Sequence, residues 1–137
     1  MNDRPGTLVD SSVLLDIFTE DPQFFDWSHA QLISAAERGA IVLNSVVLAE
    51  ISPRFPRLEE LRSVLPSIAT VEEIPIEAAF LAGHAHAEYR RSGGARQAIL
   101  PDFLIGAHAA VTGRPLLTRD PRRVARYIPG AQLITPD

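Results

Sequence analysis

The chain has 137 residues, 46% of them hydrophobic, and its 17 acidic and 13 basic residues leave a net charge of −4. A domain of this length buries about two thirds of its unfolded surface, and its mild charge excludes a polybasic nucleic-acid-binding chain. Cysteine is absent, which excludes disulfides, zinc-thiolate sites and cysteine nucleophiles. No run approaches the about 18 apolar residues of a membrane span, so we expect one cytoplasmic domain over residues 1–137.

Short apolar runs typical of strands alternate along the chain with longer runs of helical spacing. The expected strands cover residues 7–9, 40–43, 69–74, 115–118 and 131–135. The expected helices cover residues 11–18, 22–39, 45–52, 57–65, 75–93, 101–113 and 121–128, with Asn44 or Ser45 as the N-cap of the third. This alternation predicts an α/β fold in which helices cover both faces of a parallel sheet.

Two acidic residues follow predicted strands. Asp10 comes directly after the strand at residues 7–9, and Asp120 occupies the matching place after the strand at residues 115–118. In open parallel sheets ligands bind at the carboxyl ends of the strands, so both residues are candidates for one functional site. Each could instead cap the helix that follows it, because aspartate is a preferred N-cap residue.

Two further acidic residues stand in helical runs that are otherwise almost entirely apolar. Glu50 belongs to SVVLAEIS, where a charge must reach solvent at a cleft or meet a cation. Asp102 opens PDFLIGAHAAVTG, which is apolar nearly all round and should be buried. Taken alone, Asp102 could simply complement the dipole of the first helical turn.

Four carboxylates gathered in one cleft would repel one another and destabilise the fold unless a cation neutralised them. Oxygen ligands without histidine or thiolate favour a hard ion, Mg²⁺ or Mn²⁺. Such an ion activates water and stabilises the charge that develops during phosphodiester hydrolysis. The four acids therefore predict metal-assisted hydrolysis of a nucleic acid.

Four ordered segments carry a resemblance to a known family. The segments LVDSSVLLD, NSVVLAEIS, LPDFLIGAHA and LLTRDPRRVARYIPGAQLITP resemble, in order and spacing, the PIN-domain ribonucleases, and most closely the VapC-type toxins of bacterial toxin–antitoxin pairs. The resemblance implies a three-layer α/β/α sandwich with a short parallel sheet, formed as a single PIN-like nuclease domain. It also implies an acidic Mg²⁺ site at the strand ends that cleaves RNA.

The resemblance assigns a role to each acid. Asp10 is the acid of the first strand, Glu50 the acid of LAE, Asp102 the acid that opens the late helix and Asp120 the acid of TRD. Asp10, Asp102 and Asp120 would hold Mg²⁺, for which Mn²⁺ could substitute, directly or through water. Glu50 would complete the coordination shell of the metal ion or orient the attacking water molecule.

Two hydroxyl residues stand beside these acids. Ser12 matches the small hydroxyl that the family has two residues after the first acid, and it would hydrogen-bond a carboxylate or the scissile phosphate. Its alternative role is an N-cap of the helix at residues 11–18. Thr118 matches the hydroxyl of the last motif, and its alternative is a β-branched residue that merely ends a strand.

Arginines surround the last acid and could hold the phosphates that an acidic cleft would otherwise repel. The candidates for phosphate contact are Arg96, Arg119, Arg122 and Arg123, with Arg126 beside them. Arg96 lies in the segment at residues 90–97, which we expect to be the most mobile loop. For the arginines after Asp120, a solvated helix face is the alternative.

The remaining polar and aromatic residues indicate no second site. His84 and Glu88 share a helix face as zinc ligands can, but a third ligand is missing. We expect His108 to be packed or exposed rather than catalytic, and Asp16, six residues after Asp10, to face solvent or a partner. The aromatic run at residues 24–27 is most simply core, although it could receive a partner helix.

The predicted function is therefore a Mg²⁺-dependent endoribonuclease that acts as the toxin of a toxin–antitoxin pair. The resemblance implies a cognate antitoxin and a homodimer besides the RNA substrate. Two alternatives remain: a non-catalytic PIN-like module that binds RNA or protein, and a metal-dependent DNA nuclease. The complete set of four acids argues against the first, and the short chain without a clamp for duplex DNA argues against the second.

Overall fold

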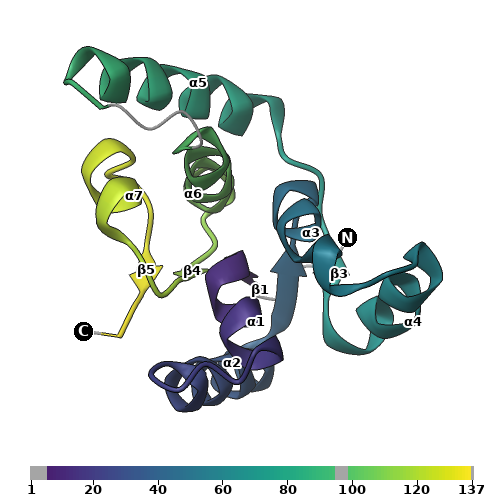
Figure 1. Cartoon of the computed structure of the whole chain (residues 1–137). Helices are drawn as coiled ribbons and strands as arrows, with labels where there is room; N and C mark the ends of the chain where they lie inside the picture. Colours follow the sequence, from purple (N-terminus) through teal and green to yellow (C-terminus); the bar gives the residue numbers. More distant parts are fainter. Residues whose placement is uncertain (1–5, 95–98, 137) are drawn as a thin grey trace.

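A parallel sheet of five short strands lies at the centre of the computed structural model, which describes residues 6–94 and 99–136 (Figure 1). The strands are β1 (Gly6–Val9), β2 (Ala40–Leu43), β3 (Thr70–Val71), β4 (Leu116–Leu117) and β5 (Leu133–Ile134). Their order across the sheet is β3-β2-β1-β4-β5, and every neighbouring pair is parallel. The first strand of the chain is therefore the central strand of the sheet.

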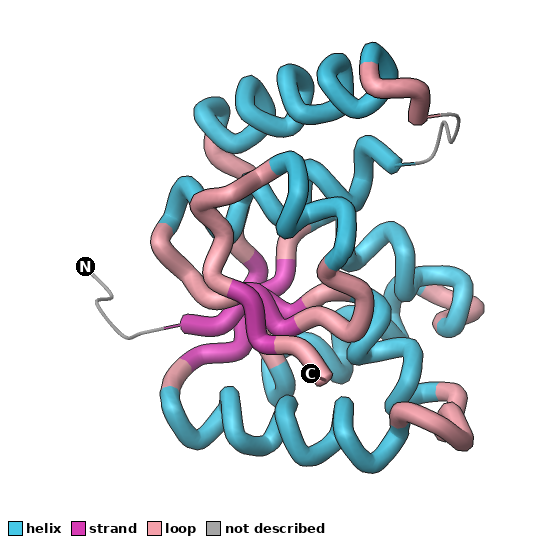
Figure 2. Tube along the Cα trace, turned by 90° about the vertical axis from the view of Figure 1, so that its left-hand side faces the viewer, coloured by secondary structure: helices cyan, strands magenta, loops and turns pink. Residues whose placement is uncertain are grey.

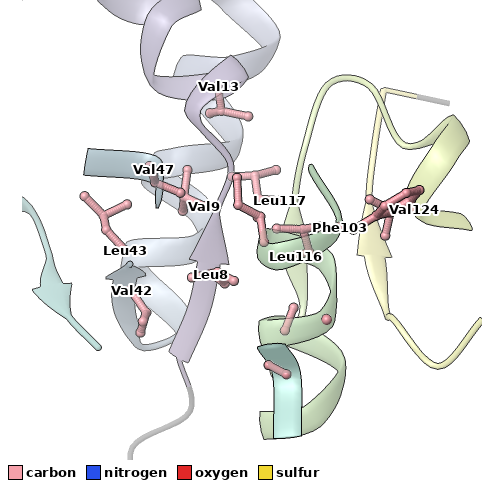
Figure 3. Packing of buried hydrophobic residues seen from close by; sticks show 14 of the residues in the cluster. Leu8, Val9, Val13, Val42, Leu43, Val47, Phe103, Leu116, Leu117 and Val124 are labelled. Atoms are coloured by element: carbon pink, nitrogen blue, oxygen red, sulfur yellow. The ribbon is translucent and has the colours of Figure 1, made fainter. Parts of the chain in front are cut away.

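The core is built around this central strand. Leu8 pairs with Val42 of β2 on one side and with Leu116 of β4 on the other. Leu8 and Val9 have no exposed surface, and Figure 3 shows them between the apolar side chains of β2 and β4. Burial on both faces explains why the central strands are apolar without polar alternation.

Helices cover the sheet on two sides, which confirms the predicted three-layer α/β/α fold. They are α1 (Ser11–Phe18), α2 (Phe25–Arg38), α3 (Ser45–Ile51), α4 (Leu58–Ile68), α5 (Ile76–Arg91), α6 (Leu100–Thr112) and α7 (Arg122–Tyr127), with a 3-10 turn at Ser52–Arg54. Helices α5 and α6 lie on one side of the strands and α2 on the other in both views (Figures 1 and 2). Within the described residues, no helix has the length and apolar character needed to span a membrane.

Several predicted boundaries differ from the structure by a few residues, and two of these differences have a clear physical cause. Helix α4 runs through Pro66 to Ile68, past its predicted end at residue 65. Proline removes its own hydrogen bond from a helix, but the bond from Ala69 N to Leu65 O, 2.9 Å long, completes the last turn. Strand β3 is limited to Thr70–Val71, shorter than the predicted 69–74, because this exposed edge strand pairs only with Val42 and Leu43.

Candidate active site

The sequence order of the strands reverses direction at β1, and this defines where a site can form. The chain places β2 and β3 on one side of β1, and β4 and β5 on the other. The segments that follow β1 and β4 therefore diverge, which opens a crevice at the carboxyl ends of these two strands. Asp10 N donates to Leu117 O at 2.9 Å, so the end of β1 is joined directly to the end of β4.

The Asp10 side chain is held by two hydroxyl groups. Its Oδ2 accepts a hydrogen bond of 2.6 Å from Ser12 Oγ and one of 2.9 Å from Thr118 Oγ1. Asp10 does occupy the N-cap position of α1, but its carboxylate makes no capping hydrogen bond. Ser12 lies inside α1, so the alternative that it caps this helix is wrong. The bond from Thr118 therefore joins the Asp10 carboxylate to the segment that follows β4.

The loop after β4 is built on the buried Thr118 hydroxyl. Besides donating to Asp10, Thr118 Oγ1 accepts a hydrogen bond of 3.2 Å from Asp120 N. Arg119 N donates to Ser12 Oγ at 3.3 Å, which fastens the same loop to α1. Helix α7 begins after its N-cap residue Pro121, so Asp120 caps no helix. Its half-exposed carboxylate belongs to the crevice.

A small cleft joins three of the four predicted acids. Asp10, Asp102 and Asp120 line it together with Thr118, above an apolar floor formed by Ile105, Leu116 and Val124. Its volume is about 10 Å³, which is room for about one water molecule. Asp102 enters the cleft from the first turn of α6, which also contains Pro101.

Burial and like charges raise the pKa of Asp102 to about 6. Removal from solvent is the main cause, followed by the negative charges of Asp10 and Glu50 and, more weakly, of Asp120. The guanidinium of Arg123 acts in the opposite direction. Because Asp102 responds to all three other acids, the predicted set of four is electrostatically one group.

Glu50 approaches this group from α3. Ser11 Oγ donates to Glu50 Oε1 at 2.7 Å, so α1 supplies a hydroxyl to this acid as well as to Asp10. Burial raises the pKa of Glu50, the Ser11 hydrogen bond lowers it and the charge of Asp10 raises it. Ser11 was not among the residues predicted from the sequence, although its place between Asp10 and Ser12 made a second hydroxyl contact possible.

The cleft offers carboxylate oxygens, which are the ligands that hard divalent cations prefer. The raised pKa of Asp102 also indicates a repulsion that a cation would relieve. However, among residues 6–94 and 99–136 no three Asp, Glu or His side chains already stand close enough to form a metal-binding group. The donor set therefore fits Mg²⁺ or Mn²⁺ in its chemistry, and the carboxylates would have to draw together around the ion.

The predicted phosphate-contacting arginines differ in their surroundings. Arg123 is half-buried and lies near enough to Asp102 to affect its pKa. Arg122 is 87% exposed, with its Nε 3.4 Å from Asp120 Oδ1. Arg119 contacts Asp16 through its Nε, at 2.9 Å from Oδ2. Arg96 lies outside the described residues.

Asp16 does not face solvent or a partner, so that expectation is wrong. Its side chain is 2% exposed and pairs with Arg119. His108 is packed, as one of the two expected outcomes had it, with no exposed surface. On α5 Glu88 pairs with Arg91 at 2.6 Å, while exposed His84 contacts the Phe80 ring at a tilted angle, so neither residue belongs to the cleft.

The fold and the cleft together define a class of protein: a three-layer α/β protein with an acidic crevice at the switch point of a parallel sheet. Solved structures share this fold. One chain of VapBC2 from Rickettsia felis, bound to a DNA fragment from its promoter, matches with a TM-score of 0.71 at 21% identity, covering 96% of this chain and 99% of that one. A toxin–antitoxin complex from Klebsiella pneumoniae matches with a TM-score of 0.67 at 22% identity, covering 96% and 98%.

A third structure, FitAcB from Neisseria gonorrhoeae, matches with a TM-score of 0.67 at 17% identity, covering 93% of this chain and 96% of that one. Comparison with protein families matches residues 7–127 to the PIN domain, so the chain belongs to the PIN domain family. The curated proteins contain no match to its sequence.

Proposed function

We propose that this PIN domain is a Mg²⁺-dependent endoribonuclease and the toxin of a toxin–antitoxin pair. The observation that carries the proposal is the state of Asp102, whose pKa is raised to about 6 by burial and by the neighbouring acids. A fold that keeps four repelling carboxylates together, in a cleft whose described lining residues include no basic side chain, gives up stability. Binding of a divalent cation returns that stability and provides the means to hydrolyse a phosphodiester.

The residues of the cleft would have different roles in this reaction. Asp10, Asp102 and Asp120 would hold Mg²⁺, or Mn²⁺ in its place, and the ion when bound lowers the pKa of a water molecule and neutralises phosphate charge. The Ser12 and Thr118 hydroxyls hold the Asp10 carboxylate in one orientation. Glu50, with a raised pKa, would orient the attacking water and accept its proton.

Arginine side chains at the rim would supply the substrate contacts. Arg122 and Arg123 stand at the start of α7, next to Asp120, where their guanidinium groups can meet phosphates on either side of the scissile bond. The half-buried Arg123 already contributes positive charge at Asp102. An RNA strand in the acidic cleft would therefore contact guanidinium groups along one edge of the cleft.

A toxin requires a neutralising partner, and the fold similarity supports this part of the proposal. The Klebsiella pneumoniae structure is a toxin–antitoxin complex, and the Rickettsia felis one contains promoter DNA. We propose a cognate antitoxin and a homodimer for this chain. Expression of the protein alone should arrest growth, and co-expression of the antitoxin encoded beside it should restore growth. Sedimentation of the purified protein measures its oligomeric state.

The decisive experiment uses pure protein, a structured RNA and a DNA of matching sequence. We expect RNA cleavage with Mg²⁺ or Mn²⁺, no cleavage in EDTA, and no cleavage by Asp10→Asn. Glu77→Gln is the matched control, because it removes one exposed carboxylate from the first turn of α5 and should cleave like the wild type.

The other outcomes identify the alternatives. Metal-dependent cleavage of DNA alone would establish a DNA nuclease and contradict the RNA substrate. Failure to cleave either nucleic acid, together with binding of RNA, would indicate a non-catalytic binding module. Growth arrest that persists in the Asp10→Asn variant would show that the toxicity does not come from this cleft.

A further inference from the structure

A partly buried ion pair joins Arg119, in the loop that carries Thr118 and Asp120, to Asp16 of α1. The Nε atom of Arg119 contacts both oxygens of Asp16, at 3.1 Å from Oδ1 and 2.9 Å from Oδ2. The Asp16 side chain is 2% exposed, and Ser28 Oγ, itself fully buried, donates to its Oδ2 at 2.8 Å. Residues of α1 and α2 therefore hold this carboxylate without help from the loop after β4.

The same guanidinium is supported on its face by an aromatic ring. The Cζ atom of Arg119 lies 4.8 Å from the centre of the Phe24 ring, a cation–π contact. Phe24 is only half-buried, so the expectation that the aromatic run at residues 24–27 is core does not hold for it. Arg119 is thus held along one edge by Asp16 and across its face by Phe24.

The remaining edge of the guanidinium is available to a ligand. Only Nε bonds to Asp16, and within the described part of the chain neither Nη atom has a hydrogen-bond partner. The side chain is 34% exposed, so these amino groups reach solvent. Arg119 also sits between Thr118 and Asp120, with its own N–H bonded to Ser12. A planar group fixed in this way is suited to a phosphate oxygen beside the cleft.

We propose that Asp16 is a positioning residue for substrate: it orients Arg119 so that the Nη atoms of that side chain bind a phosphate of the nucleic acid in the cleft. The proposal rests on the nuclease function proposed above and adds a residue to it. A buried acid is an unusual aid to anion binding, because its own charge repels the phosphate. Its benefit is that Arg119 is held in place before the substrate arrives.

This arrangement predicts a change in RNA affinity opposite to the change that simple electrostatics predicts. Replacement of Asp16 by asparagine removes a negative charge near the substrate, which by Coulomb's law alone should strengthen RNA binding. If Asp16 orients Arg119, the same replacement should weaken binding. The sign of the change therefore separates positioning from a bulk charge effect.

The experiment measures binding of a fluorescein-labelled single-stranded RNA by anisotropy, with Mg²⁺, in the full-length Asp10→Asn protein. We expect Asp16→Asn and Arg119→Gln each to weaken binding by about fivefold, and each to reduce the salt dependence by about 0.7, the contribution of one phosphate contact. The double variant should bind no more weakly than Arg119→Gln alone, because both changes remove one contact.

Asp26→Asn is the matched control, because it removes an exposed carboxylate from the first turn of α2 and should leave binding equal or slightly stronger. If Asp16→Asn does not fold, Phe24→Leu tests the same orientation from the other side and should also weaken binding.

Unchanged or tighter binding by folded Asp16→Asn, or additive losses in the double variant, would overturn the positioning role and leave the nuclease proposal intact. Lack of binding to both RNA and DNA in the Asp10→Asn protein and the wild type would overturn both proposals.

Discussion

Asn44 at the end of β2 and His108 in the middle of α6 are hydrogen-bonded at 3.0 Å in the core, although 64 residues separate them in the chain. Asn44 Oδ1 accepts the N–H of Val47 and so caps α3, which leaves the amide nitrogen to donate to His108 Nδ1. His108 Nε2 then carries the proton and contacts Glu72 Oε1 at 2.7 Å. This connection joins α3, which carries Glu50, to α6, which carries Asp102.

The direction of these hydrogen bonds predicts the behaviour of Asn44→Asp. A carboxylate can still cap α3, but its second oxygen meets the unprotonated Nδ1 of His108, and both residues are fully buried. We expect Asn44→Asp to be at least about 2 kcal/mol less stable than the wild type at pH 8.

Urea unfolding measures this effect. Asn44→Ser keeps a capping oxygen without a charge, so we expect it to lose less stability than Asn44→Asp. An equal or smaller loss in Asn44→Asp would contradict the assigned proton positions.

Replacement of Asp102 by asparagine should stabilise the metal-free protein. The pKa of Asp102 is raised to about 6 in the folded state, from about 3.9 in an unfolded chain. The folded protein therefore binds more protons between these values, and the wild type loses stability as pH rises from about 4 through about 6. Asp102→Asn has no such titration, so its advantage should be small near pH 4 and full above pH 7.

We expect this advantage to be about 1 to 2 kcal/mol at pH 7.5 in EDTA, less than the full pKa shift implies because Asp102 is partly exposed. Urea unfolding across this pH range measures it, and exposed Asp26→Asn is the control without the effect. A loss of stability in Asp102→Asn at pH 7.5 would mean that the residue mainly supports the first turn of α6.

Removal of the Thr118 hydroxyl should impair cleavage more than folding. Thr118→Val keeps the buried shape but removes the donor to Asp10 Oδ2 and the acceptor for Asp120 N. We expect RNA cleavage to fall by about tenfold or more, with a stability loss of about 1 to 2 kcal/mol. Thr118→Ser retains the hydroxyl and should retain most of the activity. Equal single-turnover rates for the two variants would show that the hydroxyl does not orient Asp10.

The packing of α6 against α7 predicts opposite effects for two glycine substitutions. An added Cβ at Gly106 would lie 2.7 Å from Val124 Cγ1, whereas one at Gly83 in α5 would meet no atom within 4 Å. Alanine favours a helix by about 1 kcal/mol over glycine, and overpacking costs about 1 to 3 kcal/mol. Gly106→Ala should therefore lower stability while Gly83→Ala raises it. Thermal unfolding compares them, and a gain in both would refute the close contact.

The α/β fold class could be predicted because the local residue patterns agree with the helices and strands that the structure contains. Asp10 and Asp120 follow apolar runs that became β1 and β4, and Asn44 caps α3 as one of the two predicted residues. The order of the strands was beyond prediction, since it depends on pairings such as Leu8 with Leu116, distant in sequence. The lengths of edge strands were also overestimated, because an apolar run pairs only where a neighbouring strand exists.

The acids of the cleft could be predicted from the local sequence, but the contacts that support them could not. Glu50 and Asp102 were recognised as charges in apolar helices, and Asp16 in SSVLLDIF satisfied the same criterion but was assigned to the surface from its distance to Asp10. Applied evenly, the criterion predicts a buried Asp16 with a cationic partner. The identity of that partner, Arg119, requires the tertiary structure, since 103 residues separate the two.

The central position of β1 also sets the order in which a growing chain can assemble the cleft. Asp10, Glu50 and Asp102 are synthesised first, and β4 must then pair with β1 before Thr118 can bond to Asp10 and bring in Asp120. A ribosome-bound chain that lacks β4 therefore has no complete cleft. If the substrate is RNA, such a chain cannot yet cleave the messenger from which it is being translated.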